Sequence, residues 1–522
     1  MTKPHGNTFS IEPTFRSPRH DAYREAGGPW EQPSLDALLT SAGRRASERI
    51  VVVDGPHRVS GNDLNDRVRC VARSLLRHGV SAGDAVAWQL PNGIDVVVVM
   101  RACWRIGAIA VPLHHGFSPI ETDRLIRRIN PKLVVDDAAL VRLQQRGFDE
   151  LDRVRVTAED VQRTDLAENA WTDGEALAAI LFTSGSSGTP KGVLHSQNTL
   201  AYKAMLMASV HQLTEHDVVL MPAPLAHVSG LLNGITLAGA VPFRAVLMAR
   251  WDAGTALDLI EREGVTFMVG PPTFFLSLLN HPAFSSERVA SLRLISSGGA
   301  GVSEAFVMMA SRRFDAVIKR TYGSTEAPSV ATSTNGDASE DAHSHDGRAI
   351  GAVELGQSTN GELLIRGPEV CLGYLDPEHT DAAFTEDGWY RSGDIATLDD
   401  NGWLNIIGRL DDVIIRGGEN IAAAEVEAII AEHSSVESVV VIGVPDELMG
   451  ERVAACIVAN DSDPDRVTLT VDALRAWCIE RGLAKYKCAE RITLIDTMPL
   501  LASGKPDRMS LRTIAASRLS DD

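Results

Sequence analysis

The sequence lacks an excess of positive charge. Its 522 residues include 69 Asp and Glu against 50 Lys and Arg, which gives a formal net charge of −19. A surface of this sign repels nucleic acid and anionic lipid. The composition therefore predicts a protein without a nucleic-acid partner.

The sequence also lacks the cysteine patterns of zinc sites and the leader of a secreted protein. Its six cysteines form no CxxC pair and no His/Cys cluster at zinc-ligand spacing, so we expect reduced, mostly buried thiols. The first residues, MTKPHGNTFSIEP, contain no apolar stretch as long as a signal peptide requires. We therefore predict a cytoplasmic location.

The longest apolar run, from Ile94 to Leu113, is not free of charge. Arg101 and Arg105 lie near its centre, and each would cost about 2.5–3.5 kcal/mol at the centre of a membrane helix. We therefore expect a buried helix followed by a strand, and no transmembrane segment.

Short β-branched runs alternate with helical patterns between about residues 50 and 320, which is typical of βαβ units and a mostly parallel sheet. From Gly361 to Gly408, short strands are separated by the turn dipeptides Asn-Gly and Asp-Gly. The sequence predicts an α/β protein: a large N-terminal domain of layered α/β sheets with a small antiparallel β subdomain, and a small, mobile C-terminal α/β domain. We place the boundary between residues 410 and 411, and we expect the first 30 residues to be loosely held.

A strand-like run from Leu177 to Phe182 precedes a segment rich in Ser, Thr and Gly that contains one lysine, TSGSSGTPKG at 183–192. Hydroxyl and glycine N–H groups in such a loop can converge on phosphate oxygens. The segment does not fit GxxxxGK[ST], because Pro190 stands where the second glycine belongs. The loop taken alone fits either a phosphate clamp or a flexible surface turn.

This loop resembles the phosphate-binding motif of the adenylate-forming superfamily of acyl-CoA synthetases, luciferases and peptide-synthetase adenylation domains. Further motifs of the superfamily follow in its order, namely PLAHVSG at 224–230, SSGGAGVS at 296–303, YGSTEA at 322–327, GELLIRGP at 361–368, YRSGDIA at 390–396, GRLDDVIIRGGENIAAAEVE at 408–427 and PLLASGKPDR at 499–508. The resemblance extends over most of the chain. Within the superfamily, the sequence most resembles cyclohexanecarboxylate and medium-chain acyl-CoA ligases.

The resemblance implies an AMP-binding domain over 1–410, a mobile domain over 411–522, and the substrates ATP, Mg²⁺ and CoA. It assigns Glu326 to Mg²⁺, and Thr325, His227 and Lys505 to catalysis. It implies that the nucleotide is bound by Thr183, Ser184, Gly185, Ser186, Ser187, Gly188, Thr189, Lys191, Gly299, Ala300, Tyr322, Gly323, Asp394 and Arg409.

The same resemblance implies an acyl pocket, a CoA site and a hinge at Asp411. The CoA site would consist of Arg416, Gly417, Gly418 and Glu419, and the acyl pocket would include Ala226, His227, Val228, Leu231, Gly299 and Gly301. The small side chains in the pocket leave volume, which favours a bulky, cyclic, aromatic or medium-chain acid. Ala422, Ala423 and Ala489 depart from the superfamily pattern and weaken the assignment of CoA contacts.

The function expected from these motifs is an ATP-dependent acid–CoA ligase that forms an acyl-adenylate and pyrophosphate, and then a thioester and AMP. An acyl-AMP ligase that loads a carrier-protein thiol is the alternative. A luciferase-like oxygenase shares the adenylation residues. The small-molecule acid, ATP and CoA are the expected partners, and a homodimer stays open.

Overall fold

The computed structural model describes residues 11–135, 153–154, 173–183, 190–334, 336–417, 419–446, 448–460, 469–500 and 506–517. The chain divides into two compact units. The first contains Met1–Leu355 and Ile365–Arg391, and the second contains Gly356–Leu364 and Ser392–Asp522. The predicted boundary at residues 410 and 411 stays a prediction.

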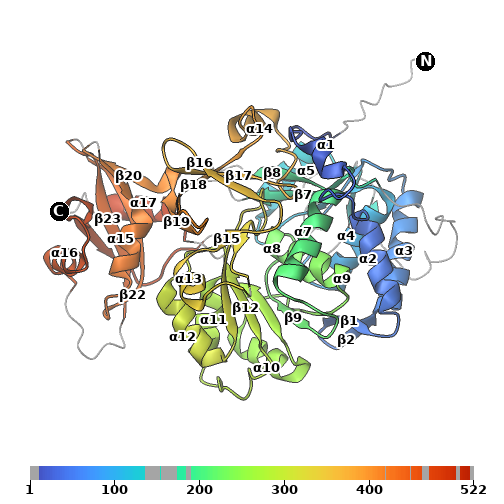
Figure 1. Ribbon diagram of the computed structural model, residues 1–522, viewed down its shortest axis with the longest axis horizontal. Helices are drawn as coiled ribbons and strands as arrows, with labels where there is room; N and C mark the ends of the chain where they lie inside the picture. The colour runs from blue at the N-terminus through green and yellow to red at the C-terminus, as the bar shows by residue number, and fades with distance from the viewer. Residues whose placement is uncertain are drawn as a thin grey trace. The chain divides into compact units, whose positions relative to one another are not determined.

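The first unit contains two sheets (Figure 1). Strands of one sheet run in the order β15 (Arg348–Ala349), β14 (Ala331–Thr332), β13 (Val317–Tyr322), β12 (Leu294–Gly298), β11 (Phe267–Gly270), β9 (Val218–Met221), β10 (Arg244–Leu247), β1 (Ile50–Asp54) and β2 (His57–Ser60). Strands of the other run in the order β6 (Arg153–Val154), β5 (Leu133–Val135), β3 (Ala85–Trp88), β4 (Ile109–Pro112), β7 (Leu177–Thr183) and β8 (Lys191–Ser196). The pairs from β1 through β10, β9, β11 and β12 to β13 are parallel, as the βαβ pattern predicts.

Alternate residues of the strands face opposite helical layers. On β9, Val219 and Met221 join a core with α2 (Leu35–Arg45), α3 (Gly61–Arg77), α4 (Ile94–Ile106), α7 (Gln197–Val210) and the π-helix η2 (Leu231–Leu237). Val218 and Leu220 join a second core with α10 (Ala253–Glu263), α11 (Pro272–Leu279) and α12 (Glu304–Phe314). On the second sheet, Val86 and Trp88 face the first core, whereas Ala85 and Ala87 face α5 (Pro119–Ile129). The layered α/β architecture is therefore confirmed.

The apolar run from Ile94 to Leu113 forms the buried helix α4 and the strand β4, as expected. Its two arginines are buried with polar partners: Arg105 pairs with Asp36 at 3.0 Å, and Arg101 donates to Asn65 at 2.9 Å. No helix among the described residues is both long enough and apolar enough to cross a membrane. The six cysteines are free thiols, all of them buried except the half-buried Cys70, which confirms that expectation.

The expectation that the first 30 residues are loosely held is wrong for residues 11–30. The indole of Trp30 is buried and donates to the carbonyl of Pro368 at 3.1 Å, and Tyr23 on α1 (His20–Arg24) is buried beside it. Further along the segment, Phe15 stacks on Phe384 with ring centroids 3.9 Å apart. Aromatic side chains that bury large apolar areas hold this segment against the rest of the first unit.

Short elements complete the first unit. They are α8 (Val228–Gly230), α9 (Ala238–Ala240), α13 (Ser339–Ser344) and α14 (Pro377–Ala383). A separate four-stranded sheet runs in the order β16 (Glu354–Gln357), β17 (Glu362–Arg366), β18 (Tyr390–Leu398) and β19 (Leu404–Arg409), with β18 and β19 antiparallel; β19 and most of β18 belong to the second unit. Its turn glycines Gly361, Gly388 and Gly402 have positive φ angles, which explains why Asn-Gly and Asp-Gly dipeptides predicted this subdomain.

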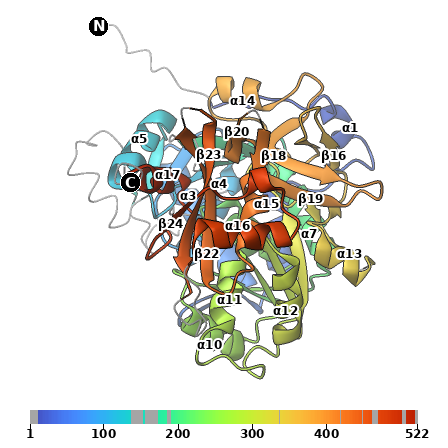
Figure 2. The same ribbon diagram turned by 90° about the vertical axis from the view of Figure 1, so that its left-hand side faces the viewer.

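The second unit is built on another sheet (Figure 2). Its strands run in the order β21 (Glu419–Ala422), β20 (Val413–Arg416), β23 (Gly450–Ala459) and β22 (Val436–Asp446), and β24 (Arg491–Leu494) pairs with β23. One core contains Val441 and Ala455 with α15 (Ala423–Ile430) and α16 (Val471–Glu480); the other contains Val440 and Cys456 with α17 (Arg508–Ser517). The short 3₁₀ turns η3 (Leu410–Asp412) and η4 (Lys485–Lys487) belong to the same unit.

Candidate active site

Three of the predicted motif loops lie at one edge of the large sheet. Strands β9, β12 and β13 belong to its parallel part, and the carboxyl ends of parallel strands open on the same edge. The acyl-pocket motif follows β9, the loop from Gly299 follows β12, and Tyr322 ends β13. Because Gly298 pairs with Thr321, the last two loops leave neighbouring strands at the same level.

The predicted phosphate loop connects the antiparallel strands β7 and β8. Thr183 and Lys191 are paired directly across these strands. The predicted nucleotide ligands Ser184, Gly185, Ser186, Ser187, Gly188 and Thr189 lie outside the described residues, as do Gly418 and Lys505. The Lys191 ammonium lies 5.6 Å from the centroid of the Tyr374 ring.

Glu326 is a buried carboxylate held by groups far away in the sequence. Only 8% of the residue is exposed. The Tyr374 hydroxyl donates to Glu326 Oε1 at 2.7 Å, and the Cys371 amide donates to the Glu326 carbonyl at 2.8 Å. Burial, followed by the charge of Glu326, raises the pKa of Tyr374, so that its hydroxyl stays protonated and available as a donor.

A second contact fixes the loop before Glu326. Nε2 of His195, on β8, lies 2.8 Å from the Thr325 carbonyl; since a carbonyl only accepts, this ring nitrogen donates. Burial lowers the pKa of His195 to about 4, so its ring is neutral near pH 7. His195 and Tyr374 were not found by sequence reasoning, because Tyr374 lies 48 positions from Glu326 and His195 lies 130 positions from Thr325.

Glu326 fits a magnesium ion that shares its coordination with a nucleotide. Among the described residues, no group of three or more His, Cys, Asp or Glu side chains is arranged to hold a metal ion. Mg²⁺ is commonly bound by one or two carboxylates together with phosphate oxygens and water. The Tyr374 hydroxyl is a neutral donor and brings no positive charge to compete with a cation.

The predicted acyl-pocket residues lie in two segments, one between β9 and η2 and one after β12. The His227 Nδ1 accepts from the Ser229 amide at 3.3 Å at the start of α8, and the side chain is half-buried, as is Ala226. Val228 and Leu231 are buried in the core. Gly299 and Gly301 are exposed, and a Cβ atom added at either glycine would meet no atom within 4 Å.

Three predicted ligands in the second unit form ion pairs. Arg409 Nε and Asp394 Oδ1 are 2.9 Å apart, because the two residues are direct partners across β18 and β19. Arg416 forms two bonds with Glu490, from Nε at 2.6 Å and from Nη2 at 2.8 Å. The predicted hinge residue Asp411 lies in the turn η3.

Comparisons with known proteins identify the family of the chain. Residues 39–375 match the family described as AMP-binding enzyme, and residues 425–505 match the AMP-binding enzyme C-terminal domain. The chain is 32% identical to the medium-chain fatty-acid–CoA ligase of Escherichia coli strain K12, over 99% of this chain and 96% of that protein. It is 33% identical, over 92% and 99% of the two chains, to a Rhodococcus jostii ligase named for CoA and a propanoyl group that carries a methyl-dioxo-octahydroindene ring system.

A solved structure gives the same result for the fold. The o-succinylbenzoate CoA synthetase of Bacillus subtilis, in complex with ATP and magnesium ion, superposes with a TM-score of 0.81 at 27% identity. The match covers 92% of this chain and 99% of that one. The chain therefore belongs to the AMP-binding enzyme family of the adenylate-forming superfamily and is an AMP-forming acyl-CoA synthetase.

Proposed function

We propose that this enzyme joins a bulky or ring-bearing carboxylic acid to CoA in two half-reactions that depend on ATP and Mg²⁺. The observation that carries the proposal is the buried carboxylate of Glu326 after β13, which accepts from the Tyr374 hydroxyl while the Cys371 amide holds the Glu326 backbone carbonyl. It lies in the loop that leaves the sheet beside the loop of Gly299. Such an edge suits a nucleotide phosphate next to an acyl group.

In the first half-reaction, a carboxylate oxygen of the acid bonds to the α-phosphorus of ATP, and the bond to the β-phosphate oxygen breaks to release pyrophosphate. Bound Mg²⁺ supplies neutralisation of the phosphate charge, and Glu326 would hold it with Thr325 beside it. Lys191 and the hydroxyl-rich segment from Thr183 would hold the departing phosphates. By resemblance, Lys505 contacts the reacting oxygens.

In the second half-reaction, the CoA sulfur bonds to the acyl carbon while the bond to AMP breaks, and the thiol proton is released to solvent. By resemblance, Asp394 and Arg409 hold the ribose, Tyr322 and Ala300 contact the adenine, and the segment from Gly417 to Glu419 lies beside the thiol. The resemblance also assigns a hinge to Asp411. The names of the relatives support CoA as the acceptor rather than a carrier protein.

The space beside Gly301 supports a large acid. A Cβ atom at Gly301 would meet no other atom within 4 Å, and its neighbour Ala300 is small. The named substrates of two relatives, a medium-chain acid and an acid with a fused ring system, are also large. A side chain at position 301 would therefore occupy part of the acyl space.

The experiment that tests the proposal follows products across a panel of acids. The protein is incubated with ATP, Mg²⁺, CoA and each acid, and AMP, ADP and acyl-CoA are measured by mass spectrometry. We expect AMP and acyl-CoA in equal amounts, with cyclic, aromatic or medium-chain acids ahead of acetate. Formation of ADP, or transfer to a carrier-protein thiol but not to CoA, would contradict the proposal.

The variant Gly301→Leu tests the acyl space. We expect it to lower kcat/KM for the best bulky acid more than for a short acid, because a side chain would fill the pocket. Gly336→Leu is the matched control, since a Cβ atom there also meets no atom within 4 Å. An equal loss of kcat/KM for bulky and short acids would show that Gly301 does not line the acyl pocket.

A further inference from the structure

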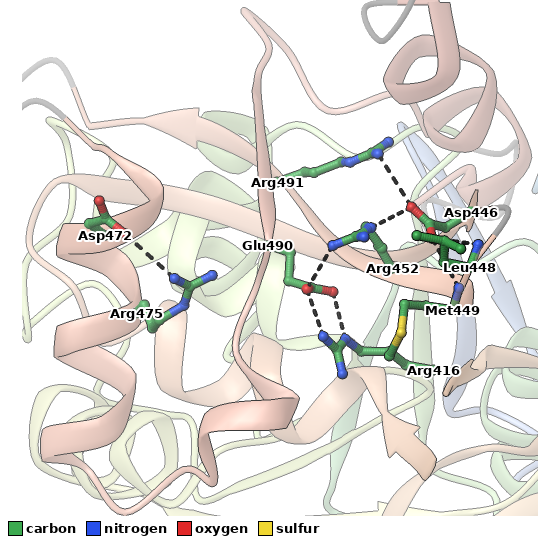
Figure 3. A network of polar contacts seen from close by, with 9 residues as sticks. All are labelled: Arg416, Asp446, Leu448, Met449, Arg452, Asp472, Arg475, Glu490 and Arg491. Carbon is green, nitrogen blue, oxygen red and sulfur yellow. Dashed lines mark hydrogen bonds and ion pairs between the residues drawn. The ribbon is translucent and has the colours of Figure 1, made fainter. Parts of the chain in front are cut away.

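The hairpin predicted to meet CoA is held by a network of charged side chains (Figure 3). The hairpin consists of β20 and β21, in which Arg416 is paired with Glu419. Glu490 precedes β24 and accepts both bonds from the Arg416 guanidinium. It also accepts from Arg452 Nη1 at 3.1 Å, so that two cations share one carboxylate.

The second half of the network fixes the neighbouring turn. Asp446 ends β22 and accepts from the amides of Leu448 and Met449 at 3.1 and 3.0 Å. Arg452 forms an ion pair with the same carboxylate. Hydrogen bonding to Arg452 lowers the pKa of Asp446 to about 2, so this carboxylate is ionised near pH 7.

Both halves meet at Gly417. The Gly417 amide donates to the Met449 carbonyl at 2.8 Å, within the turn that Asp446 holds. The preceding residue, Arg416, is fixed by Glu490. Gly417 has a φ angle of +58°, and a Cβ atom there would lie 2.5 Å from Met449 Cε. The backbone at this position is thus held by Arg416 on one side and by Met449 on the other.

The Arg416 guanidinium is engaged by the Glu490 carboxylate. Its side chain is 20% exposed and that of Glu490 is 13% exposed, and the bonds have the bidentate geometry that arginine forms with a carboxylate. The guanidinium edge formed by Nε and Nη2 therefore faces Glu490 and is not available to the phosphates of CoA. Hydrogen bonding to Glu490 raises the pKa of Arg416, in agreement with a tight pair.

We infer that Arg416 is a positioning residue for the thioester step, which together with Glu490 fixes the backbone at Gly417, and that it does not bind CoA itself. The inference rests on the proposed function, because it gives a role to a residue of the same CoA-facing segment. It assigns the same role to Glu490, a residue that no motif selected. The two side chains therefore act as one unit.

The test compares Arg416→Gln, Glu490→Gln and the double variant in the conversion of supplied acyl-AMP and CoA to acyl-CoA. We expect each single variant to lower kcat about 10-fold, with KM for CoA nearly unchanged, because the loss is of geometry. The double variant should be no slower than Glu490→Gln alone, since that change already breaks the pair with Arg416 as well as the bond from Arg452. Adenylation, followed by pyrophosphate exchange, should be unaffected.

Arg475→Gln is the matched control. Arg475 pairs with the exposed Asp472 at 3.5 Å in the same unit and loses the same charge on substitution. It should leave both half-reactions unchanged. A rise in KM for CoA with Arg416→Gln alone, additive losses in the double variant, or no loss in either single variant would each overturn the inference.

A readout that does not depend on activity completes the test. In the wild type, the Gly417 amide is hydrogen-bonded, so we expect Glu490→Gln to speed its hydrogen exchange, whereas Arg475→Gln should not. Unchanged exchange would overturn the positioning role even if no acid proved to be a substrate. Should the single variants fail to fold, Arg416→Lys decides: a lower kcat with an unchanged KM for CoA supports the inference, and a raised KM for CoA overturns it.

Discussion

Two carboxylates, one in each unit, are held by different kinds of partner. Glu326 in the first unit is 8% exposed and accepts from the neutral hydroxyl of Tyr374. Glu490 in the second unit accepts from the guanidinium groups of both Arg416 and Arg452. A neutral donor orients a carboxylate and leaves its negative charge uncompensated, whereas two arginines neutralise that charge. The difference separates a carboxylate suited to bind a cation from one that fixes a backbone.

Two ion pairs, one in each unit, also differ in how deeply they are buried. Near Glu326, Lys203 and Glu369 form a 2.7 Å pair in which both side chains are 0% exposed, and Lys203 also donates to the Ser329 carbonyl. The side chains of Arg416 and Glu490 keep contact with solvent. A buried pair costs far more to break than a half-exposed one, because removing one partner leaves the other charge buried and uncompensated.

The largest expected effect is on stability, in Lys203→Met. We expect a loss of about 3–5 kcal/mol in the free energy of unfolding, since Glu369 is left as an unpaired buried charge. Urea unfolding of the first unit measures the loss. The double variant Lys203→Met with Glu369→Gln should recover most of it, and a double variant as unstable as the single one would show that packing rather than charge is responsible.

Glu326→Gln should have the next largest effect, on chemistry rather than on folding. We expect adenylation to slow by about 10²–10³-fold, because the substitution keeps the shape but removes the charge that would hold Mg²⁺. Pyrophosphate exchange measures this step. Conversion of supplied acyl-AMP to thioester should stay near the wild-type rate. Equal loss of both steps would argue against a role confined to the metal and phosphates.

Tyr374→Phe should have a smaller effect in the same direction. A hydrogen bond to a charged group contributes about 1.5–3 kcal/mol, and the variant removes one such bond while Glu326 stays in place. We expect adenylation to slow roughly 10-fold and the apparent affinity for Mn²⁺ with ATP, followed by electron paramagnetic resonance, to weaken. Unchanged Mn²⁺ binding would show that the hydroxyl does not orient the carboxylate.

The smallest expected effect is on the pH dependence of stability, and it comes from His211, a buried histidine of the first unit. Burial, followed by repulsion from Lys319, Arg293 and Lys203, lowers the pKa of His211 to about 3. The unfolded chain, with a pKa near 6.5, binds this proton more readily, so stability is full above pH 6.5 and falls as the pH drops toward 3. His211→Gln should remove up to about 1.4 kcal/mol per pH unit from that slope. The exposed His216→Gln is the control, and it should leave the slope unchanged.

Local patterns in the sequence predicted the elements well. The helix α4 and the strand β4 lie where the run from Ile94 to Leu113 predicted them, the parallel strands of the large sheet lie in the region predicted to form βαβ units, and the turn glycines at 361, 388 and 402 were predicted by their dipeptides. These features depend on neighbouring residues alone. The order of the motifs along the chain predicted the superfamily.

Contacts between distant residues could not be predicted in this way. Tyr374 reaches Glu326 and Glu490 reaches Arg416 only because the sheets bring separate segments together, and the two pairs are 48 and 74 positions apart. The docking of residues 11–30 was missed for the same reason. The polar character of this segment favours a free end, but Trp30 and Phe15 find apolar and carbonyl partners beyond residue 365.

The docked N-terminal segment has a consequence for synthesis on the ribosome. The Thr14 hydroxyl donates to the Tyr374 carbonyl, 360 positions later in the chain. At about 5–20 residues per second, these partners emerge tens of seconds after Thr14 does. Residues 14–30 are thus made long before their final partners, so the nascent chain must carry this segment without these contacts until Tyr374 and Phe384 have left the ribosome.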